Sequence, residues 1–327
     1  MYFVLPLIRE AYSFFERCDD LEAINIIKVV LEEGLKYAIL ALGVYLSYSI
    51  LDFPDLSVDG TMPLGAIVSC VLILKGINPW ISLLAAFACG LAAGCLTGIL
   101  HVKLKLEPLL SGILVYTVLL SVNLVLIKFG TGGQSIASIF GKDTIFTNGL
   151  ANVLPMNIGG VNVRKLIVLA IFVLVLKIVM DMYLKTKSGM LLRATGSNQQ
   201  YVVMLAQNPG ATKILGLAIG NGLAAISGAV IAQSTETANT TMGVGMVVFG
   251  LSSVIIGLSL FKRLGFMKAT TMVIFGTIVY KACLQIAVVI GLPSEYNKIL
   301  MAVLFVLALV FSGTLKEKTK KRREKHA

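Results

Sequence analysis

The strongest constraint on this chain is a series of long apolar runs separated by short polar or basic segments. About 20 apolar residues cross the hydrocarbon core of a bilayer as a helix. The pattern therefore predicts an all-α polytopic membrane protein with about nine transmembrane helices. The second run is short, which favours a broken helix over a simple span there. The runs lie at about 34–51, 61–75, 79–100, 108–128, 164–184, 211–233, 241–260, 268–291 and 297–314.

Composition excludes an ordinary soluble domain. The 327 residues are 57% hydrophobic and 14% charged, with a mean hydropathy of +0.89, whereas soluble domains carry about a quarter charged residues. The net charge of +11 does not indicate nucleic acid, because Lys and Arg are confined to short segments between the runs and to the C-terminal tail. Such a tail marks the cytoplasmic side and can also contact anionic membrane lipid.

The basic segments predict one orientation in the membrane. A single assignment places 101–105, 185–193, 262–268 and the tail inside, as the positive-inside rule requires. Arg164 and Lys165 then fall outside and count against it. The assignment divides the chain into an external amphipathic or surface segment at 1–33, a transmembrane domain at 34–314 and a basic cytoplasmic tail at 315–327. The segment 129–163 becomes the largest external region, either a solvated loop or a surface for an external partner.

Small residues recur every fourth position on two of the predicted helices. With no side chain, glycine lets helix backbones approach closely in a membrane. The sequence therefore predicts close helix packing at Gly90, Gly94 and Gly98, and again at Gly216 and Gly220.

The polar segment 186–210 is punctuated by glycine and lies on the predicted cytoplasmic side. A short helix bounded by Gly189 and Gly196, with Ser188 capping its start, would lie along the membrane surface. Such a helix can act as a rigid lever that docks into a motor protein. A cytoplasmic loop without a partner is the open alternative.

Polar interruptions within the apolar sequence supply the candidates for a solute pathway. Pro54 and Gly60 break helical continuity, and unwound backbone at membrane depth is tolerated only when buried in protein or lining a watery cavity. An ordinary loop at the inner surface is an equal alternative for 52–60. The candidate pathway residues are Asp55, Ser57, Asp59, Gln233, Glu236, Tyr280 and Lys281.

Two lysines within apolar runs need partners. A lysine at the bilayer centre costs at least about 2.5 kcal/mol, so Lys281 must face the bundle, water or an acid. A structural ion pair is favoured over a pathway role for it. Lys177 can pair with Asp181 one turn further along its helix.

The sequence contains no set of residues that indicates catalysis. Its only histidines, His101 and His326, lie in basic segments, and neither a Ser-His-Asp set nor paired metal ligands stand out. No GxxxxGK[ST] phosphate loop is present, so we expect this chain to bind no cofactor. These observations disfavour a membrane enzyme. A stand-alone secondary transporter or channel remains an alternative, which would need its own ion-coupling acids and no docking helix.

Three stretches resemble a known transporter family. SGMLLRATGSNQQYVVMLAQNPGATKILGLAIGNGLAAISGAVIAQ at 188–233 looks like the coupling region of ABC importer permeases of the branched-chain amino acid and ribose type. ALGVYLSYSILDFPDLSVDGTMPLGA at 41–66 and VNLVLIKFG at 122–130 resemble further elements of that family. The tryptophan/tyrosine-type branch is the most similar. The chain departs from the family at Leu205–Pro209, where Gln207 stands in place of a frequent Gly before Asn208.

The resemblance implies a division of labour among several proteins in a bacterial plasma membrane. This chain would form the pathway with a second permease copy, for a small solute such as an amino acid, aromatic in the closest branch. An extracellular solute-binding lipoprotein would deliver the solute, and an ABC ATPase carrying ATP and Mg²⁺ would bind 185–208 from inside. The coupling residues by this resemblance are Ser188, Gly189, Leu192, Arg193, Ala194, Gly196 and Asn198.

Overall fold

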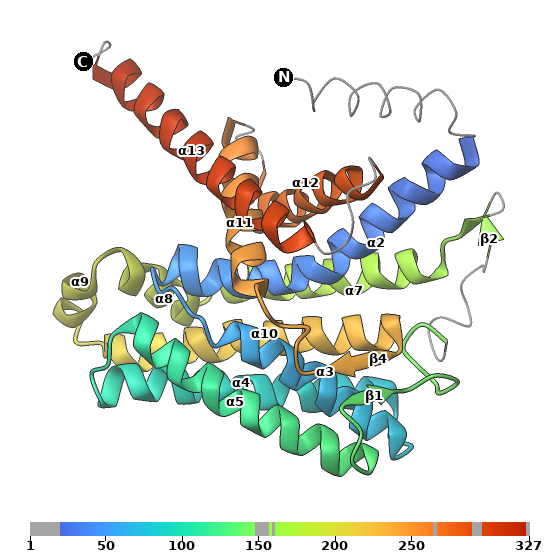
Figure 1. The fold of residues 1–327 in the computed structure, drawn as a ribbon. Helices are drawn as coiled ribbons and strands as arrows, with labels where there is room; N and C mark the ends of the chain where they lie inside the picture. Colours follow the sequence, from blue (N-terminus) through green and yellow to red (C-terminus); the bar gives the residue numbers. More distant parts are fainter. Residues whose placement is uncertain (1–19, 148–156, 159–160, 264–266, 290–295, 325–327) are drawn as a thin grey trace.

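The computed structural model describes residues 20–147, 157–158, 161–263, 267–289 and 296–324 (Figure 1). Within these residues, helices dominate and four short strands accompany them. The helices are α2 (Asp20–Val44), α3 (Val58–Leu74), α4 (Pro79–Lys103), α5 (Pro108–Thr131), α7 (Arg164–Tyr183), α8 (Lys187–Ser197), α9 (Gln199–Met204), α10 (Pro209–Thr235), α11 (Met246–Leu260), α12 (Ala269–Val289) and α13 (Asn297–Glu324). A π-helical turn, η1 (Tyr45–Ile50), continues α2, and a 3-10 turn, η2 (Phe261–Arg263), follows α11.

Each predicted apolar run overlaps one of these helices, although the run at 34–51 continues into η1 and the run at 241–260 begins before α11. Within the described residues, α4, α5, α7, α10 and α12 are long and apolar enough to cross a membrane, and α3, α11 and residues Asn297–Val310 of α13 are shorter apolar helices. The chain is an all-α multi-pass membrane protein. The count of nine spans stays a prediction.

The predicted segment boundaries fall inside continuous helices. Helix α2 runs from Asp20 across the boundary at 33 without a break, and α13 runs across the boundary at 314 to Glu324. Residues 1–19 of the predicted external segment and 325–327 of the predicted tail lie outside the described residues. The three-part division therefore stays a prediction.

Helix α10 forms the centre of the bundle, between α2, α3 and α4 (Figure 1). Its residues 220–233 are all buried. A Cβ atom at Gly98 would lie 2.7 Å from the Ile214 Cα, and one at Gly90 would lie 2.6 Å from the Ala225 Cβ. Only glycine fits at such distances, so the close packing predicted at 90, 94 and 98 is confirmed and lies between α4 and α10. Gly216 and Gly220 face other neighbours: the side chains of Leu51 and Leu192, and the backbone of Gly43.

Helix α3 begins in the interior of the bundle, after an unwound segment. After η1 the chain unwinds over residues 51–57, and α3 begins at Val58. Leu51, Phe53 and Asp55 in this connection are buried, so the unwound backbone is enclosed by protein. The predicted broken helix is thus a continuous 17-residue helix preceded by an unwound segment.

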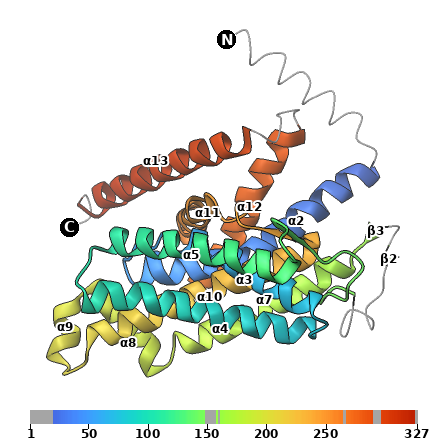
Figure 2. The same ribbon diagram turned by 60° about the horizontal axis from the view of Figure 1, so that its bottom comes forward.

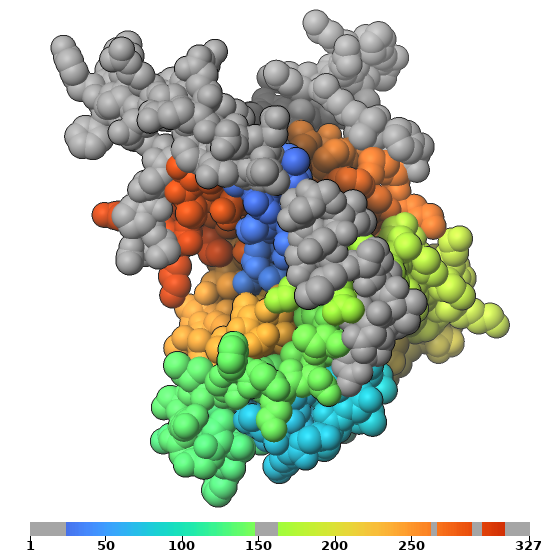
Figure 3. All heavy atoms as spheres, turned by 90° about the vertical axis from the view of Figure 1, so that its right-hand side faces the viewer, coloured from blue at the N-terminus to red at the C-terminus, as the bar shows by residue number. Residues whose placement is uncertain are grey.

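The two ends of the bundle differ in structure. Figures 1 and 2 place α8 and α9 at one end and the strands at the other. Strand β1 (Ile136–Ser138) pairs antiparallel with β4 (Thr237–Asn239), and β2 (Asn157–Ile158) pairs with β3 (Val161–Asn162). On the face shown in Figure 3, green residues of α5 and the segment after it adjoin orange residues that follow α10. The β1–β4 pair therefore joins the segment after α5 to the end of α10.

Candidate functional site

The segment predicted to couple to a motor protein forms two helices, α8 and α9. The side chain of Thr186 accepts a hydrogen bond from the Gly189 N–H at 3.3 Å and caps α8. The prediction that Ser188 caps this helix was wrong, because the Ser188 hydroxyl lies 3.3 Å from the Tyr183 hydroxyl instead. Asn198 caps α9, with its side-chain oxygen 3.0 Å from the Gln200 nitrogen.

Gly189 and Gly196 lie inside α8, so the prediction that they bound it was also wrong. Their role is close packing. A Cβ atom at Gly196 would collide with the carbonyl oxygen of Ile50, and one at Gly189 with the backbone of Tyr183 and Leu184. The two glycines therefore hold α8 against the end of η1 and against the turn that follows α7.

The two faces of α8 and α9 have opposite character. Leu192 is buried and its side chain lies where a Cβ atom on Gly216 of α10 would be, and Val202 of α9 is also buried. Ala194 is half-buried. The outer face exposes several apolar side chains together with Lys187, Arg193 and the polar residues 197–200, and exposed apolar patches mark interaction sites. We call its exposed apolar and aromatic side chains together with Arg193 the α8–α9 surface: Met190, Arg193, Tyr201, Val203, Met204 and Leu205.

The turn between α9 and α10 carries the departure from the family pattern. Ala206 has φ +54°, a left-handed conformation that glycine adopts more readily than alanine. Asn208 then caps α10, with its side-chain oxygen 2.9 Å from the Gly210 nitrogen. The chain keeps a tight turn here without glycine at 205–209.

Arg193 also lines a pocket of about 410 Å³ beside the ends of α7 and α12. In this pocket Asp181 accepts hydrogen bonds from Thr270 at 2.6 Å and from Lys268 at 3.0 Å. Lys177 lies 3.6 Å from Asp181, which confirms the pair predicted along the helix. Asp181 therefore joins α7 to α12 next to the α8–α9 surface.

The interruption at 52–60 is folded into a buried hydrogen-bond network. Asp55 accepts from the Ser57 hydroxyl at 2.6 Å and from the Asn221 amide at 2.7 Å. The Asn221 oxygen in turn accepts from Thr61 at 2.8 Å and Ser57 at 3.1 Å. All four side chains are buried. We call them the central polar cluster; it ties the start of α3 to the middle of α10.

Asp59 binds the start of another helix. Its two carboxylate oxygens accept from the Val247 nitrogen at 2.7 Å and the Gly245 nitrogen at 3.1 Å, at the N-terminus of α11. A carboxylate stabilises a helix N-terminus, where backbone N–H groups lack partners and the helix dipole is positive. The two interior helix starts, of α3 and α11, are therefore joined through one side chain.

Gln233 and Glu236, close in sequence, have different surroundings. The Gln233 side chain is buried and joins Ser69 at 2.9 Å, Ser82 at 3.1 Å and the Ile145 nitrogen at 3.0 Å. Glu236 ends α10 in a left-handed conformation, and its carbonyl oxygen accepts from the Ile139 nitrogen at 2.9 Å. Its side chain is half-exposed. Gln233 thus connects helices, whereas Glu236 lies beside the β1–β4 pair.

Tyr280 and Lys281 contact α2 and its neighbours. The Lys281 ammonium lies 3.4 Å from the Glu33 carboxylate and 3.8 Å from the centroid of the Tyr37 ring. Tyr280 is buried, with its hydroxyl 3.2 Å from the Met301 carbonyl and its ring edge-on to Phe249. Lys281 therefore has an acid partner, as its position in an apolar run requires.

Sequence reasoning missed several polar residues of this interior, above all Asn221, Thr61 and Glu33. Asn221 stands between Gly220 and Gly222 in an apolar run, and an amide at such a position was the available signal. Among the described residues, no three His, Cys, Asp or Glu side chains gather as metal ligands.

Comparisons with known proteins agree on one family. Residues 26–309 match the family model described as branched-chain amino acid transport system / permease component. A tyrosine transport system permease protein from Clostridioides difficile is 38% identical over 90% of this chain and 94% of its own length. A fructose import permease protein, FruF, from Bifidobacterium longum is 26% identical over 87% of this chain and 76% of its own length. A solved structure, PsaBC from Streptococcus pneumoniae in complex with Fab, has a TM-score of 0.50 and 12% identity, covering 92% of this chain and 95% of that chain, so its likeness extends to the fold alone.

Proposed function

Because the chain belongs to the family of branched-chain amino acid transport permeases, it is the permease subunit of an ABC-type importer, and we propose that its solute is an amino acid. One observation carries the choice of solute: the tyrosine permease is more similar to this chain than the fructose permease, at 38% against 26% identity. An aromatic amino acid is the first solute to test. A sugar is the second candidate, favoured by the fructose relative.

The solute is tested by uptake into cells that express the complete importer. We expect labelled tyrosine to accumulate and unlabelled phenylalanine or tryptophan to compete with it, while fructose does neither. If fructose accumulates and amino acids neither accumulate nor compete with it, the solute is a sugar and the amino acid proposal is wrong. Binding measurements on the solute-binding protein check the same point independently of this chain.

We propose that the α8–α9 surface is where an ABC ATPase docks. The support is its composition, with Arg193 exposed among Met190, Tyr201 and Met204, because aromatic residues, Met and Arg are enriched in protein interfaces. Leu192, Gly189 and Gly196 hold this surface in place from the buried side. ATP and Mg²⁺ would bind to the ATPase, and this chain would hold no cofactor.

Charge reversal at Arg193 tests the docking. Arg193→Glu should reduce co-purification of the ATPase by at least about tenfold, because a central Arg often dominates an interface. Lys142→Glu is the matched control, since Lys142 is exposed and belongs to the segment after α5. If Arg193→Glu keeps both the ATPase and solute uptake, the docking proposal fails and a stand-alone transporter or channel gains support.

The orientation of the chain is a further part of the proposal. We place α8 and α9 in the cytoplasm, the β1–β4 end outside, and nine spans between an external N-terminus and a cytoplasmic C-terminus in a bacterial plasma membrane. In a background whose five native cysteines are replaced by serine, a membrane-impermeant maleimide on intact cells should then label Lys142→Cys and leave Met204→Cys unlabelled. The reverse pattern would invert the orientation.

The β1–β4 end would receive a solute-binding lipoprotein, and a second copy of the permease would complete the pathway. Glu236 is the first candidate for contact with solute, because its side chain is half-exposed at that end. Asp55, Ser57, Asp59, Gln233, Tyr280 and Lys281 bond mainly to neighbouring helices, and we propose that they affect transport by positioning those helices. Crosslinking between copies through introduced cysteines would test the dimer.

A further inference from the structure

A polar pocket of about 330 Å³ lies at the same end of the bundle as the α8–α9 surface, apart from that surface and from the central polar cluster. Its volume is at the lower end of the range of about 300–1,000 Å³ that is usual for small-molecule sites. Three separate parts of the chain form it: the last turn of α4 with the residues after it, the start of α9 and the first turns of α10. Its lining residues are His101, Val102, Lys105, Gln199, Pro209, Gly210 and Lys213.

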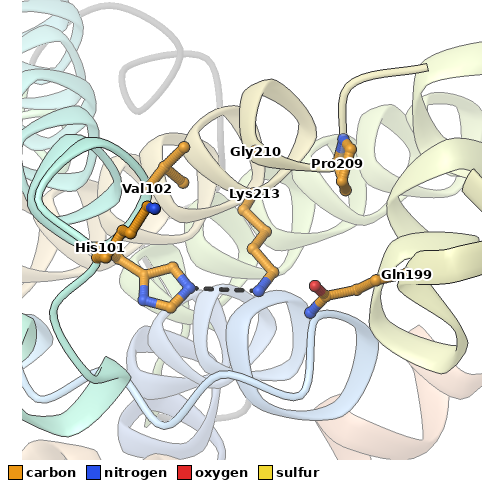
Figure 4. Close-up of a pocket in the computed structure, with 7 residues that line it drawn as sticks. His101, Val102, Gln199, Pro209, Gly210 and Lys213 are labelled. Carbon is orange, nitrogen blue, oxygen red and sulfur yellow. Dashed lines mark hydrogen bonds between the residues drawn. The ribbon is translucent and has the colours of Figure 1, made fainter. Parts of the chain in front are cut away.

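The pocket contains two lysines and a histidine, and hydrogen bonds orient the His101 ring and the Lys213 side chain. The His101 Nδ1 is 2.8 Å from the Leu106 carbonyl oxygen, so Nδ1 carries the proton and donates it there. The His101 Nε2 then accepts from the Lys213 ammonium at 3.2 Å (Figure 4). In this arrangement His101 offers a ligand no N–H donor, and Lys213 is the donor that faces the pocket. Of the three N–H donors of that ammonium, two remain to bind a ligand.

Within the part of the chain that the structure describes, the cations of this pocket form no ion pair with an acid. Among the described residues, none of the ion pairs includes Lys105 or Lys213. Glu107, the nearest acid along the chain, is exposed and forms no ion pair with either. Figure 4 shows the Gln199 amide on the same side as the Lys213 ammonium, where it supplies further N–H donors.

The backbone at Lys105 is strained. Its φ is +54°, in the left-handed region that glycine adopts more readily than a residue with a side chain. A glycine would relieve this strain, but the chain places a lysine here that also lines the pocket.

The connection from α4 to α5, which contains Lys105, also exposes apolar side chains. Leu104, next to Lys105 in the sequence, is 62% exposed, and Leu109 and Leu110 at the start of α5 are also exposed. Exposed apolar side chains close in sequence to a cation of the pocket suit a ligand with an anionic head and a hydrocarbon body.

We propose that this pocket binds the phosphate group of an anionic lipid headgroup, through Lys213, Lys105 and the Gln199 amide. Basic pockets between transmembrane helices on the cytoplasmic side bind such headgroups, and hydrogen bonds to an ionised phosphate are roughly twice as strong as neutral ones. The inference rests on the proposed orientation, which puts α8 and α9 in the cytoplasm. Since α9 and α10 both border the pocket, a bound lipid would brace the turn between them.

Lipid binding to the purified full-length permease tests the inference. The probe is phosphatidylglycerol, titrated into detergent with phosphatidylcholine as background and detected by native mass spectrometry. Lys213→Gln and Lys105→Gln should each weaken phosphatidylglycerol binding by about tenfold, and Lys213→Arg should restore most of it. Lys75→Gln, which removes an exposed lysine at the end of α3, is the control and should bind as the wild type does. Lys105 is exposed and lies outside the helices, so we expect Lys105→Gln to fold. This variant can therefore test the inference even if Lys213→Gln does not fold.

Two further measurements identify the anion: competition by inorganic phosphate and retention of the ATPase. Saturating inorganic phosphate that displaces phosphatidylglycerol would show that free phosphate also occupies the pocket, whereas no displacement would assign the pocket to lipid alone. Undiminished phosphatidylglycerol binding in both lysine variants overturns the inference. If those variants keep the lipid but lose the ATPase, the occupant is an acidic group of the ATPase and the inference is likewise overturned. A wild-type permease that never retains an ATPase would instead count against the proposed function.

Discussion

The central polar cluster and the α8–α9 surface both interrupt apolar sequence, and the fold treats them in opposite ways. Asp55, Ser57, Thr61 and Asn221 are buried and bond to one another. Arg193, Tyr201 and Met204 are exposed, beside further exposed apolar side chains such as Met190 and Val203. A polar break in a membrane protein therefore has two meanings. Where its groups find partners within the chain it holds helices together, and where they do not it is available to another molecule.

Removing Asn221 gives the largest expected effect on stability. Asn221→Leu removes the amide that donates to the Asp55 Oδ2 at 2.7 Å, while Ser57 and Thr61 keep their bonds to Asp55 and to the Ser57 carbonyl. A buried polar group left unsatisfied costs about 1–3 kcal/mol, and a charged group costs more. We expect a loss of about 3 kcal/mol or more in the free energy of unfolding, measured by denaturant titration in detergent. Asn198→Ala, at the exposed cap of α9, is the control and should lose about 1 kcal/mol. Equal losses in the two variants would remove the distinction between the regions.

Substitution of Asp59 should cause the second largest loss of stability, because this half-buried side chain joins the starts of α3 and α11. Asp59→Ala removes two hydrogen bonds at the N-terminus of α11 and should lower the free energy of unfolding by about 2 kcal/mol. Glu236→Ala should change it by less than about 0.5 kcal/mol and yet reduce solute uptake. Wild-type uptake in Glu236→Ala would take that residue out of the pathway.

Removing the cap of α8 should have a smaller effect on stability. The comparison of Thr186 with Ser188 tests which of the two hydroxyls forms the cap. Thr186→Ala should destabilise the start of α8 by about 1 kcal/mol, whereas Ser188→Ala should cost less than about 0.5 kcal/mol. Hydrogen exchange at the Gly189 amide reports the difference locally. Faster exchange in Ser188→Ala than in Thr186→Ala would assign the cap to Ser188 after all.

The smallest effect on stability is expected on the α8–α9 surface. Met204 is 81% exposed, so Met204→Asp should leave the free energy of unfolding within about 0.5 kcal/mol of the wild type. The same change should reduce ATPase co-purification, because it places a charge in an apolar interface. Loss of stability without loss of the ATPase would mean that this side chain belongs to the interior.

The sequence predicted where the helices lie better than it predicted which helices pack against each other. Apolar runs mark helices because lipid admits little else, and the glycines at 90, 94 and 98 identified a face that packs closely. Neither signal says which helix lies opposite, so the pairing of α4 with α10 needed the structure. The cap of α8 was misassigned because Thr186 and Ser188 are both good capping residues, and only the helix start at Lys187 decides between them. The network of Asp55 could not be predicted, since Asn221 lies 166 residues away.

The long sequence separation between Asp59 and its partner has a consequence for biosynthesis. Asp59 and Val247 are 188 residues apart. At a synthesis rate of about 5–20 residues per second, roughly 10–40 s pass between the two. Throughout that interval the nascent chain holds the start of α3 in the membrane without the amides that Asp59 binds in the finished protein. Translation arrested before α11 would leave this carboxylate without the Gly245 and Val247 amides that it binds in the finished protein.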